Sequence, residues 1–232
     1  DVVTVPCCTE GGYTTYICEL CGYSYQAKYE DALGHTFVGG TCISCGEADP
    51  DYEAPVEPPF ADVPAGAYYE APVLWAVENG ITSGATENSF NPGGACLRAH
   101  VVTFLWRAAG CPESAITTSR FTDVKPTDFF FKPVLWAVEQ KITSGVSATE
   151  FGSYANCNRA AVVTFLWRAA GCPEPLTTNN PFTDVKPTDF FYKPVLWAVE
   201  NGITAGLTAT TFGPTAECNR AQVVTFLYRA YN

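Results

Sequence analysis

The stretch Cys157-Asn-Arg-Ala-Ala-Val-Val-Thr-Phe-Leu-Trp-Arg-Ala-Ala-Gly171 occurs three times in this chain of 232 residues. The other two copies begin at Cys96 and Cys218, and each lies 61 residues from Cys157. A spacing that stays fixed through three copies indicates a repeated structural module. The chain is therefore expected to be a triplicated unit that follows a different, cysteine-rich segment.

The apolar residues of this stretch recur at helical spacing. Val162 and Leu166 fall on one stripe, as the apolar face of a helix requires. Asn158 precedes the stripe as an N-cap, and Gly171 fits a C-terminal stop. In the first copy Leu97 occupies the cap position and has no side-chain acceptor. The start of that helix is expected to be weaker by about 1 kcal/mol.

An arginine follows the cap position in every copy, at Arg98, Arg159 and Arg220. A cation near a helix N-terminus opposes the helix dipole, so the stability of the helix does not explain it. The guanidinium and the free N–H groups of the first turn would together suit an anion. The alternative is a structural arginine paired with a carboxylate of a neighbouring repeat. The pattern favours the anion site and leaves the alternative open.

Each copy belongs to a longer unit that carries a second helix. The units open with Phe-x-Asp-Val, at Phe60, Phe121 and Phe182. A helical segment follows, which Gly80 and Gly202 end in the first and third units. Lys141 stands at that place in the second unit, so its stop is less clear. We predict two helices and a long loop per unit, over residues 60–111, 121–172 and 182–232.

Residues 1–46 form a separate module that contains six of the eleven cysteines. Two knuckles stand out, Cys18-Glu-Leu-Cys21-Gly22 and Cys42-Ile-Ser-Cys45-Gly46, separated by 20 residues. Paired Cys-x-x-Cys motifs at this spacing predict a tetrahedral zinc site made by Cys18, Cys21, Cys42 and Cys45. The residues between the knuckles alternate like short strands. The module is therefore expected to be a small β-rich, zinc-ribbon-like unit.

Two alternatives stay open for this module. The ligand set can instead be Cys8, Cys18, Cys21 and His35, or the thiols can form disulfides in an exported protein. In either case the role is structural, because about 46 residues bury too little core without a staple. Residues 47–59, rich in proline and acidic residues, are expected to form an extended linker.

Composition excludes several classes of function. The net charge is −11 and no basic residues cluster in a run, which argues against nucleic-acid binding. No apolar run is long enough to span a bilayer, so no membrane insertion is expected. The sequence opens at Asp1 without a signal peptide, which indicates a mature chain or an excised fragment.

The sequence also carries no catalytic pattern, so no enzyme activity is expected. No serine elbow, phosphate loop or pair of catalytic carboxylates is evident. His100 occurs in one repeat only and is interpreted as a surface residue of the first helical turn. The tryptophans of the shorter helices, Trp75, Trp136 and Trp197, lie within apolar runs and are predicted to belong to the core.

These landmarks, in the same order in all three units, make residues 60–232 resemble three tandem S-layer homology domains. The resemblance implies a mainly α fold, with a pseudo-threefold trimer of two-helix repeats around a central three-helix bundle. It also implies an extracellular, monomeric protein at the bacterial cell surface. Its function would be to anchor an exported protein by binding an anionic, often pyruvylated, secondary cell-wall polysaccharide in grooves between adjacent repeats.

The same resemblance assigns the ligand-binding residues by position. Arg98, Arg159 and Arg220 match the family arginine that contacts the carboxylate of the ligand, whereas the family glutamate two positions later is absent. Aromatic residues stand where the family has tryptophan, at Tyr68, Phe129 and Phe190. The loop after the first helix places further residues near the groove: Ser83, Gly84, Ser144, Gly145, Ala205 and Gly206. The competing hypothesis is a protein–protein interaction module, for S-layer assembly or adhesion, with no glycan ligand.

Overall fold

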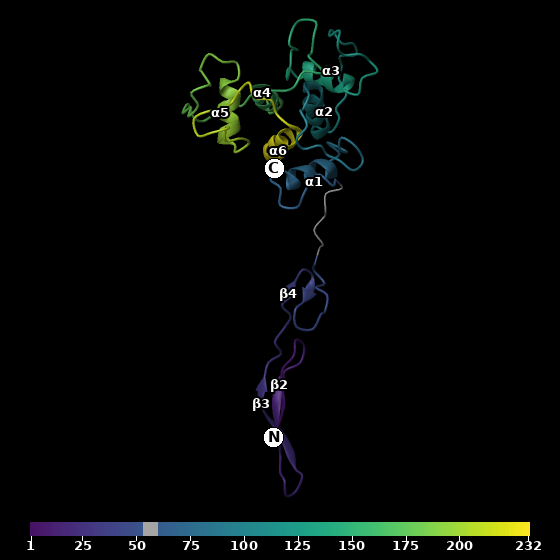
Figure 1. Ribbon diagram of the computed structural model, residues 1–232, viewed down its shortest axis with the longest axis vertical. Coiled ribbons are helices and arrows are strands. Elements are labelled where there is room, and N and C mark those ends of the chain that lie inside the picture. The colour runs from purple at the N-terminus through teal and green to yellow at the C-terminus, as the bar shows by residue number, and fades with distance from the viewer. Residues whose placement is uncertain (53–59) are drawn as a thin grey trace. The chain divides into compact units, whose positions relative to one another are not determined.

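The computed structural model describes residues 1–52 and 60–232 (Figure 1). The chain divides into two compact units, one within residues 1–56 and one within residues 57–232. The small unit holds the strands and the large unit holds the helices. A mainly helical fold with a small β module at the N-terminus, as predicted, is thereby confirmed.

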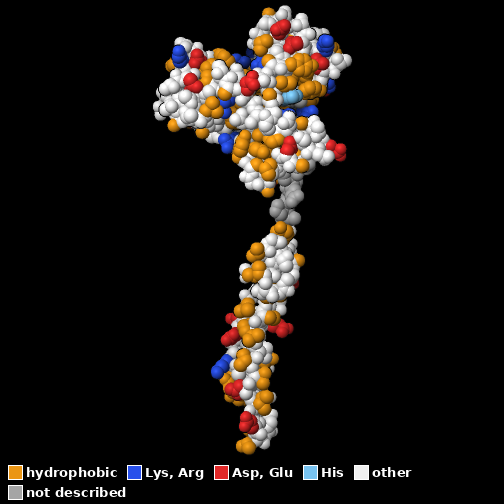
Figure 2. Space-filling view, viewed as in Figure 1, with side chains coloured by type: hydrophobic (Ala, Val, Ile, Leu, Met, Phe, Trp, Pro, Cys, Tyr) orange, Lys and Arg blue, Asp and Glu red, His pale blue; other side chains and the backbone are white. Residues whose placement is uncertain are grey.

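Three antiparallel strands form the main sheet of the small unit: β1 (Val2–Thr4), β2 (Gly12–Ile17) and β3 (Ser24–Glu30). A second hairpin pairs β4 (Phe37–Val38) with β5 (Thr41–Cys42). Tyr16 lies opposite Tyr25 in the sheet, and their rings stack with centroids 5.2 Å apart. Most side chains of these strands are exposed, and Figure 2 shows hydrophobic side chains on the surface of this unit. So little burial requires a staple to hold the unit together.

Residues 47–52 belong to the small unit, although the sequence predicts them as the start of the linker. The Cys42 N–H donates to the Glu47 carbonyl over 2.7 Å, and the Asp49 N–H donates to the Gly40 carbonyl over 2.9 Å. The Tyr52 ring lies against Gly40, where any side chain would collide with it. The rest of the predicted linker, residues 53–59, lies outside the described residues.

Each repeat of the large unit supplies a shorter and a longer helix. The shorter helices are α1 (Glu70–Glu78), α3 (Phe131–Glu139) and α5 (Tyr192–Glu200). The longer helices are α2 (Arg98–Ala108), α4 (Arg159–Ala169) and α6 (Arg220–Tyr231). Trp136 and Trp197 are buried in the core as predicted, and Trp75 packs against the core half-buried. The tryptophans therefore serve packing.

The helices pair between repeats. α3 of the second repeat packs on α2 of the first, and α5 of the third packs on α4 of the second. α1 of the first repeat packs on α6 of the third, which closes the series. α4 also contacts both α2 and α6, and Figure 1 shows these three helices toward the middle of the large unit. Each repeat therefore buries the apolar face of its shorter helix against a neighbour.

A ring of backbone hydrogen bonds also joins the three repeats. The Cys96 N–H donates to the Cys218 carbonyl, Cys157 to Cys96, and Cys218 to Cys157, over 2.8–3.0 Å. All three thiols are buried, as small apolar side chains would be. Each donor and acceptor in this ring comes from a different repeat. The first repeat consequently contacts the third as directly as it contacts the second.

The long loop of each repeat is fastened to the start of that repeat. Asp123 accepts hydrogen bonds of 2.8 Å from the N–H groups of Phe151, Gly152 and Ser153. The equivalent acids, Asp62 and Asp184, accept N–H bonds from the corresponding loops. The anchoring phenylalanine of every loop is fully buried: Phe90, Phe151 and Phe212. The aspartate of the Phe-x-Asp-Val opening therefore holds the long loop of its own repeat in place.

Two expectations about helix ends differ from the structure. Lys141 adopts φ +57°, the left-handed conformation that Gly80 and Gly202 adopt in the other repeats, so the shorter helix stops at the same place in all three. At the start of α2, the Leu97 N–H donates to Nδ1 of His100 over 3.4 Å. The imidazole thus supplies one half of a capping box and compensates in part for the missing Asn side chain.

Candidate functional site

The arginine after each cap links two repeats. Arg98 Nε donates to the Phe151 carbonyl over 3.1 Å, and Arg159 Nε donates to the Phe212 carbonyl over 3.0 Å. Arg220 Nε completes the series through the Phe90 carbonyl of the first repeat, over 2.8 Å. The partner of Nε is in every case a backbone carbonyl of the next repeat. The alternative hypothesis, an arginine that pairs with a neighbouring repeat, is therefore right about the repeat, but Nε bonds to a backbone carbonyl and not to a carboxylate.

Each guanidinium lies between two phenylalanine rings. The Arg159 guanidinium carbon is 4.8 Å from the centroid of Phe212 and 5.4 Å from that of Phe226. The other two arginines are placed in the same way. Such contacts with two aromatic rings hold the guanidinium in place. Burial lowers the pKa of all three arginines, so each charge gains from an anionic partner.

The outer nitrogens of these arginines are satisfied to different extents. Arg159 Nη2 donates to the Thr204 hydroxyl over 2.9 Å. Arg220 Nη2 is buried and has no hydrogen-bond partner among the residues that the structure describes. A buried donor without a partner costs about 1–3 kcal/mol, more when charged. Arg220 therefore keeps a hydrogen-bond donor that no described residue satisfies.

The first-turn N–H groups are not free for an anion, contrary to the sequence expectation. At the start of α4, Arg159 donates to the Ala216 carbonyl and Ala160 to the Pro214 carbonyl, over 2.9 and 3.1 Å. The next N–H, of Ala161, is capped by Asn158 Oδ1 over 2.9 Å. These donors hold the repeats together. Any anion recognition here falls to the guanidinium groups.

A groove of about 360 Å³, which we call groove 1, lies beside Arg220. Its walls are residues 82–85 of the first repeat, one face of α2, Phe129 of the second repeat and Arg220 of the third. Arg107 of α2 also lines it, so the groove contains two guanidinium groups. No acidic residue is among its described lining residues, although the chain has a net charge of −11. The groove is therefore a locally positive space.

Groove 2, of about 380 Å³, repeats this arrangement one unit further along the chain. Arg98 and Arg168 supply its guanidinium groups, and residues 143–146 supply the loop. Phe190 of the third repeat stands where Phe129 stands in groove 1. Its described lining is likewise free of acidic residues. The large unit therefore carries two equivalent positive grooves, each between adjacent repeats.

The structure brings most of the predicted ligand residues into these grooves. Ser83 and Gly84 line groove 1, and Ser144 and Gly145 line groove 2. The aromatic residues predicted to stack on sugar are largely exposed: Tyr68, Phe129 and Phe190. At the third equivalent place, Arg229 lies near Tyr68 and opposes the rise in its pKa that burial causes. Gly206 occupies the third loop, with φ +87° and the Phe182 ring against it.

The sequence reasoning missed the second arginine of each groove. Arg107 and Arg168 donate to the carbonyls of Ile81 and Ile142 over 3.0 Å and line grooves 1 and 2. Their repetition in Trp-Arg-Ala-Ala-Gly was visible in the sequence. His100 is also a groove residue. Burial, and then the charge of Arg220, lower the pKa of His100, so its ring is neutral near pH 7.

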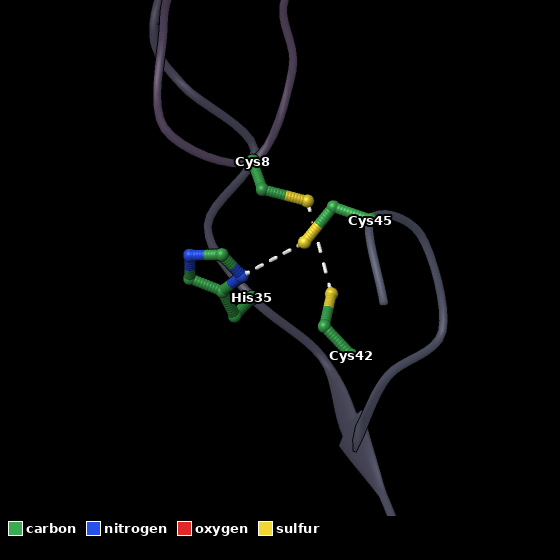
Figure 3. A group of neighbouring side chains, drawn as sticks. All are labelled: Cys8, His35, Cys42 and Cys45. Carbon is green, nitrogen blue, oxygen red and sulfur yellow. Dashed lines mark hydrogen bonds between the residues drawn. The ribbon is translucent and has the colours of Figure 1, made fainter. Parts of the chain in front are cut away.

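A second candidate site lies in the small unit, where Cys8, His35, Cys42 and Cys45 point toward one another (Figure 3). The sulfurs of Cys8 and Cys42 are 3.8 Å apart, and Cys45 Sγ is 3.4 Å from His35 Nδ1. A zinc tetrahedron with bonds of about 2.3 Å to sulfur and about 2.1 Å to nitrogen has edges of about 3.6–3.8 Å. These two distances are close to the edges of such a tetrahedron, and all four donor atoms lie within 4.8 Å of one another.

The surroundings of this cluster also favour a metal. His35 Nε2 lies 3.4 Å from a carboxylate oxygen of Glu47, which is the usual partner of a metal-bound imidazole. The N–H groups of Cys45 and Ser44 lower the pKa of Cys42 to about 5, which favours the thiolate. Burial and the neighbouring thiols raise the pKa of Cys8 to about 12. A cation would reverse that rise, because it neutralises the charge that the thiolates share.

Of the predicted set Cys18, Cys21, Cys42 and Cys45, the structure brings only Cys42 and Cys45 into the cluster. Of the competing set Cys8, Cys18, Cys21 and His35, it brings in Cys8 and His35. Cys18 and Cys21 lie in the turn between β2 and β3, whereas Cys8 precedes β2 and His35 follows β3. The six residues of β2 separate the two ends of the sheet by about 20 Å at a rise of about 3.3 Å per residue. Cys8 and His35 therefore complete the second knuckle.

Comparison with known proteins agrees with the repeats. The model of the S-layer homology domain matches residues 59–102, 120–162 and 181–224. An endoglucanase from Bacillus sp. (strain KSM-635) is 33% identical over 53% of this chain and 13% of its own length. A cell surface protein from Thermoanaerobacter kivui is 28% identical over 58% of this chain and 18% of its own length. The chain thus spans less than a fifth of either relative.

Among the described residues, no helix is both long enough and apolar enough to cross a membrane.

Proposed function

Because the chain belongs to the S-layer homology domain family, we propose that residues 60–232 anchor an exported protein non-covalently to the bacterial cell wall. Members of this family are cell-surface anchoring modules, and this is a cell-wall-associated protein. The ligand that we propose is an anionic secondary cell-wall polysaccharide, in pyruvylated form. It binds in the grooves between adjacent repeats. The observation that carries this proposal is the buried Nη2 of Arg220, a residue that lines groove 1, because no residue that the structure describes accepts a hydrogen bond from this atom.

The charge of the grooves supports a carboxylated ligand. Each groove combines two arginines with exposed hydroxyl groups, such as Ser83 in groove 1 and Ser144 in groove 2. Arginine forms paired hydrogen bonds with a carboxylate, and hydroxyl groups bond to sugar hydroxyls. Because the whole chain is acidic, long-range attraction to an anionic wall is weak and recognition depends on the grooves. Several weak sites on one chain then add avidity along a polymer.

The exposed aromatic residues support a sugar ligand. Phe129 is 61% exposed and Phe190 is 68% exposed, each on the lining of its groove. An apolar ring held open to solvent at a binding groove suits the apolar face of a sugar ring. Tyr68 is the equivalent aromatic residue of the first repeat, and we propose the same contact with sugar for it. The imidazole of His100 stacks on Phe129 with centroids 5.8 Å apart and holds that ring in position.

The groove linings support a role in anchoring. Hydrolysis of a glycoside needs two carboxyl groups on opposite sides of the bond that is cleaved. The described linings of grooves 1 and 2 contain arginine, threonine and aromatic side chains and no carboxylate. Any catalytic activity of a longer protein that contains this chain would belong to other residues.

Cyclic contacts among the repeats further support a pseudo-threefold trimer of repeats around α2, α4 and α6.

An added negative charge in the grooves tests the anchor. The variant Ser83→Asp/Ser144→Asp adds one carboxylate to each groove at an exposed position. A carboxylate close to the ligand anion is expected to lower the affinity for purified sacculi, measured by co-sedimentation, by about tenfold or more. The control is Ala148→Asp/Ala209→Asp, which adds the same charge at exposed positions outside the described groove linings.

The sacculi are used before and after chemical removal of the secondary polymer. Binding by the wild type and the control is expected to depend on the polymer, and both variants are expected to keep the wild-type melting temperature. Equal binding by both variants would rule out the grooves as the binding site for the polymer. Binding that persists on stripped sacculi would favour the protein-interaction hypothesis instead.

For the small unit we propose a structural zinc ion held by Cys8, His35, Cys42 and Cys45. Three thiolates and one imidazole form a closed tetrahedral site without an open position for substrate. Removal of the metal with a strong chelator is expected to unfold the sheet and leave the melting of the repeats unchanged. Cys42→Ser should lose the ion, whereas Cys111→Ser should retain it. A sheet that survives chelation with its tyrosine signals intact would contradict the proposal.

A further inference from the structure

The two knuckles of the small unit have the same backbone geometry. In the first, the Cys18 N–H donates to the Tyr23 carbonyl over 2.8 Å and the Gly22 N–H donates to the Cys18 carbonyl over 2.9 Å. In the second, the corresponding bonds join Cys42 to Glu47 over 2.7 Å and Gly46 to Cys42 over 2.9 Å. The two glycines adopt φ +72° and +78°. The first knuckle is thus shaped like the one that directs Cys42 and Cys45 into the metal cluster.

The first knuckle nevertheless holds only half of a metal site. Cys18 and Cys21 lie at the tip of the hairpin that joins β2 to β3, and both are exposed. Within residues 1–52 and 60–232, the only group of three or more cysteine, histidine or acidic side chains at metal-binding distance is the cluster around Cys8. A tetrahedral thiolate site at the tip therefore needs two more donors from outside this chain.

The tip also exposes apolar surface. Leu20, between the two cysteines, is 99% exposed, and Tyr23 next to the knuckle is 68% exposed. Ile17, at the end of β2, is 49% exposed. Apolar side chains gathered at the end of a hairpin indicate a surface that another molecule covers. A second copy of the same tip would cover this surface with its own apolar residues and would supply the missing thiols.

We propose that two copies of this chain join tip to tip through one zinc ion, held by Cys18 and Cys21 of each copy. A twofold axis through the ion makes the contact self-complementary, as in most homodimers. The four thiols lose four protons to solvent on binding, and the charge of the ion offsets part of the negative charge of the thiolates. This assembly replaces the monomer that the family resemblance implies. It also places two sets of wall-binding repeats in one particle.

The test uses the full chain, purified with a non-thiol reductant and zinc, by light scattering combined with metal analysis. The wild type is expected to be a dimer with about 1.5 zinc ions per chain, one in each Cys8 cluster and one shared. Cys18→Ser/Cys21→Ser is expected to be a monomer with about one zinc ion per chain. The control, Cys111→Ser/Cys172→Ser, removes the two exposed thiols of the repeats and is expected to behave as the wild type.

Chelation and the Cys18→Ser/Cys21→Ser variant together distinguish the bridge from other forms of association, because the chelator also removes the ion of the Cys8 cluster. A strong chelator is expected to convert the wild-type dimer to a monomer while the reductant stays present. A wild type that remains monomeric with zinc would overturn the proposal, as would a dimer that persists in Cys18→Ser/Cys21→Ser. A dimer that resists the chelator and separates only on addition of reductant would show a disulfide and would also overturn it. These outcomes are independent of whether the repeats bind the wall.

Discussion

Arg98, Arg159 and Arg220 share one backbone position and one Nε contact, yet their outer nitrogens differ. Thr204 satisfies Arg159 Nη2, whereas Arg220 Nη2 is buried without a partner among the described residues. A repeated sequence position therefore does not guarantee a repeated chemical environment. Groove 1, beside Arg220, is expected to gain most from an anionic ligand, because the ligand would satisfy a donor that is otherwise desolvated at a cost.

The loop glycine Gly145 is required for two reasons, its positive φ and the lack of space for a Cβ, and the two can be measured separately. Gly145 has φ +87°, and a Cβ there would come within 2.6 Å of the Phe121 ring and the Glu150 carbonyl. Gly171 has φ +84° with no heavy atom within 4 Å of such a Cβ. Gly171→Ala is expected to cost about 1 kcal/mol from backbone strain, and Gly145→Ala about 3 kcal/mol because packing adds to it. Urea unfolding measures both, and equal losses would contradict the packing argument.

The acid of the Phe-x-Asp-Val opening makes the fold sensitive to low pH. Desolvation opposes ionisation of Asp123, but hydrogen bonds from the N–H groups of Ser153 and Phe151 outweigh it and lower its pKa below the usual 3.8. A carboxyl whose pKa is lowered on folding stabilises the native state above about pH 4, and that contribution is lost as the pH falls through the lowered pKa. Asp62 has the same direction of shift.

Asp123→Asn is therefore expected to lower the free energy of unfolding by about 2 kcal/mol at pH 7. The difference from wild type should shrink as the pH falls below about 4, because the wild-type carboxyl then loses its charge. Urea unfolding at a series of pH values measures this difference. A difference that stays constant down to pH 2 would show that the charge of Asp123 does not stabilise the loop.

At the scale of elements, the end of α3 shows a local preference that the tertiary structure overrides. Lys141 adopts φ +57° because the chain must turn there, as it does at Gly80 and Gly202. A side chain in this conformation costs about 1 kcal/mol relative to glycine. The following N–H, of Ile142, bonds to the Ala137 carbonyl over 2.8 Å, so the turn is kept in spite of the strain.

Lys141→Gly is expected to raise the free energy of unfolding by about 1 kcal/mol, since it removes this strain. Gln140→Gly is the matched control, because Gln140 has φ −77° and gains nothing from glycine. It should destabilise the protein by about 0.5–1 kcal/mol. Thermal melting of both variants measures the effect, and a loss of stability in Lys141→Gly would show that the lysine side chain contributes contacts of its own.

At the scale of the whole molecule, the closed order of contacts makes the three repeats interdependent. α1 packs on α6, and Arg220 bonds to the Phe90 carbonyl across a sequence separation of 130 residues. In an open repeat array each unit depends only on its neighbours in sequence. Here the first repeat depends on the last.

A chain that ends at residue 180 is therefore expected to lose cooperative unfolding, including the protection of α1 against hydrogen exchange. The packing partner of α1 lies in the deleted part, so its apolar face would meet water. Removal of residues 1–52 serves as the control and should leave the melting of the repeats unchanged, because that unit is compact by itself. Retained protection of α1 in the shorter chain would contradict a closed ring.

The repeat pattern predicted much of this architecture. The spacing of 61 residues, the apolar stripe of Val162 and Leu166, and the caps predicted the six helices. It also named Arg98, Arg159 and Arg220, which the structure places at the seams between repeats. It failed where partners are distant in sequence, because propensity and periodicity report only on neighbours along the chain. The second groove arginines, such as Arg107, belong to this class. Cys8 and His35 were predicted only as alternative ligands, and only the structure joins them to Cys42 and Cys45.

The sequence by itself determined the repeat, the two-helix unit and the pair of cysteine knuckles, since each is encoded within a few consecutive residues. Only the tertiary structure decided that shorter helices pack on a neighbouring repeat, that first-turn N–H groups join repeats, and that Cys8 and His35 complete the second knuckle. The physical reason lies in the sheet and the ring. A strand places its two ends about 20 Å apart, and a closed ring brings residue 90 to residue 220, so proximity in space no longer follows order along the chain.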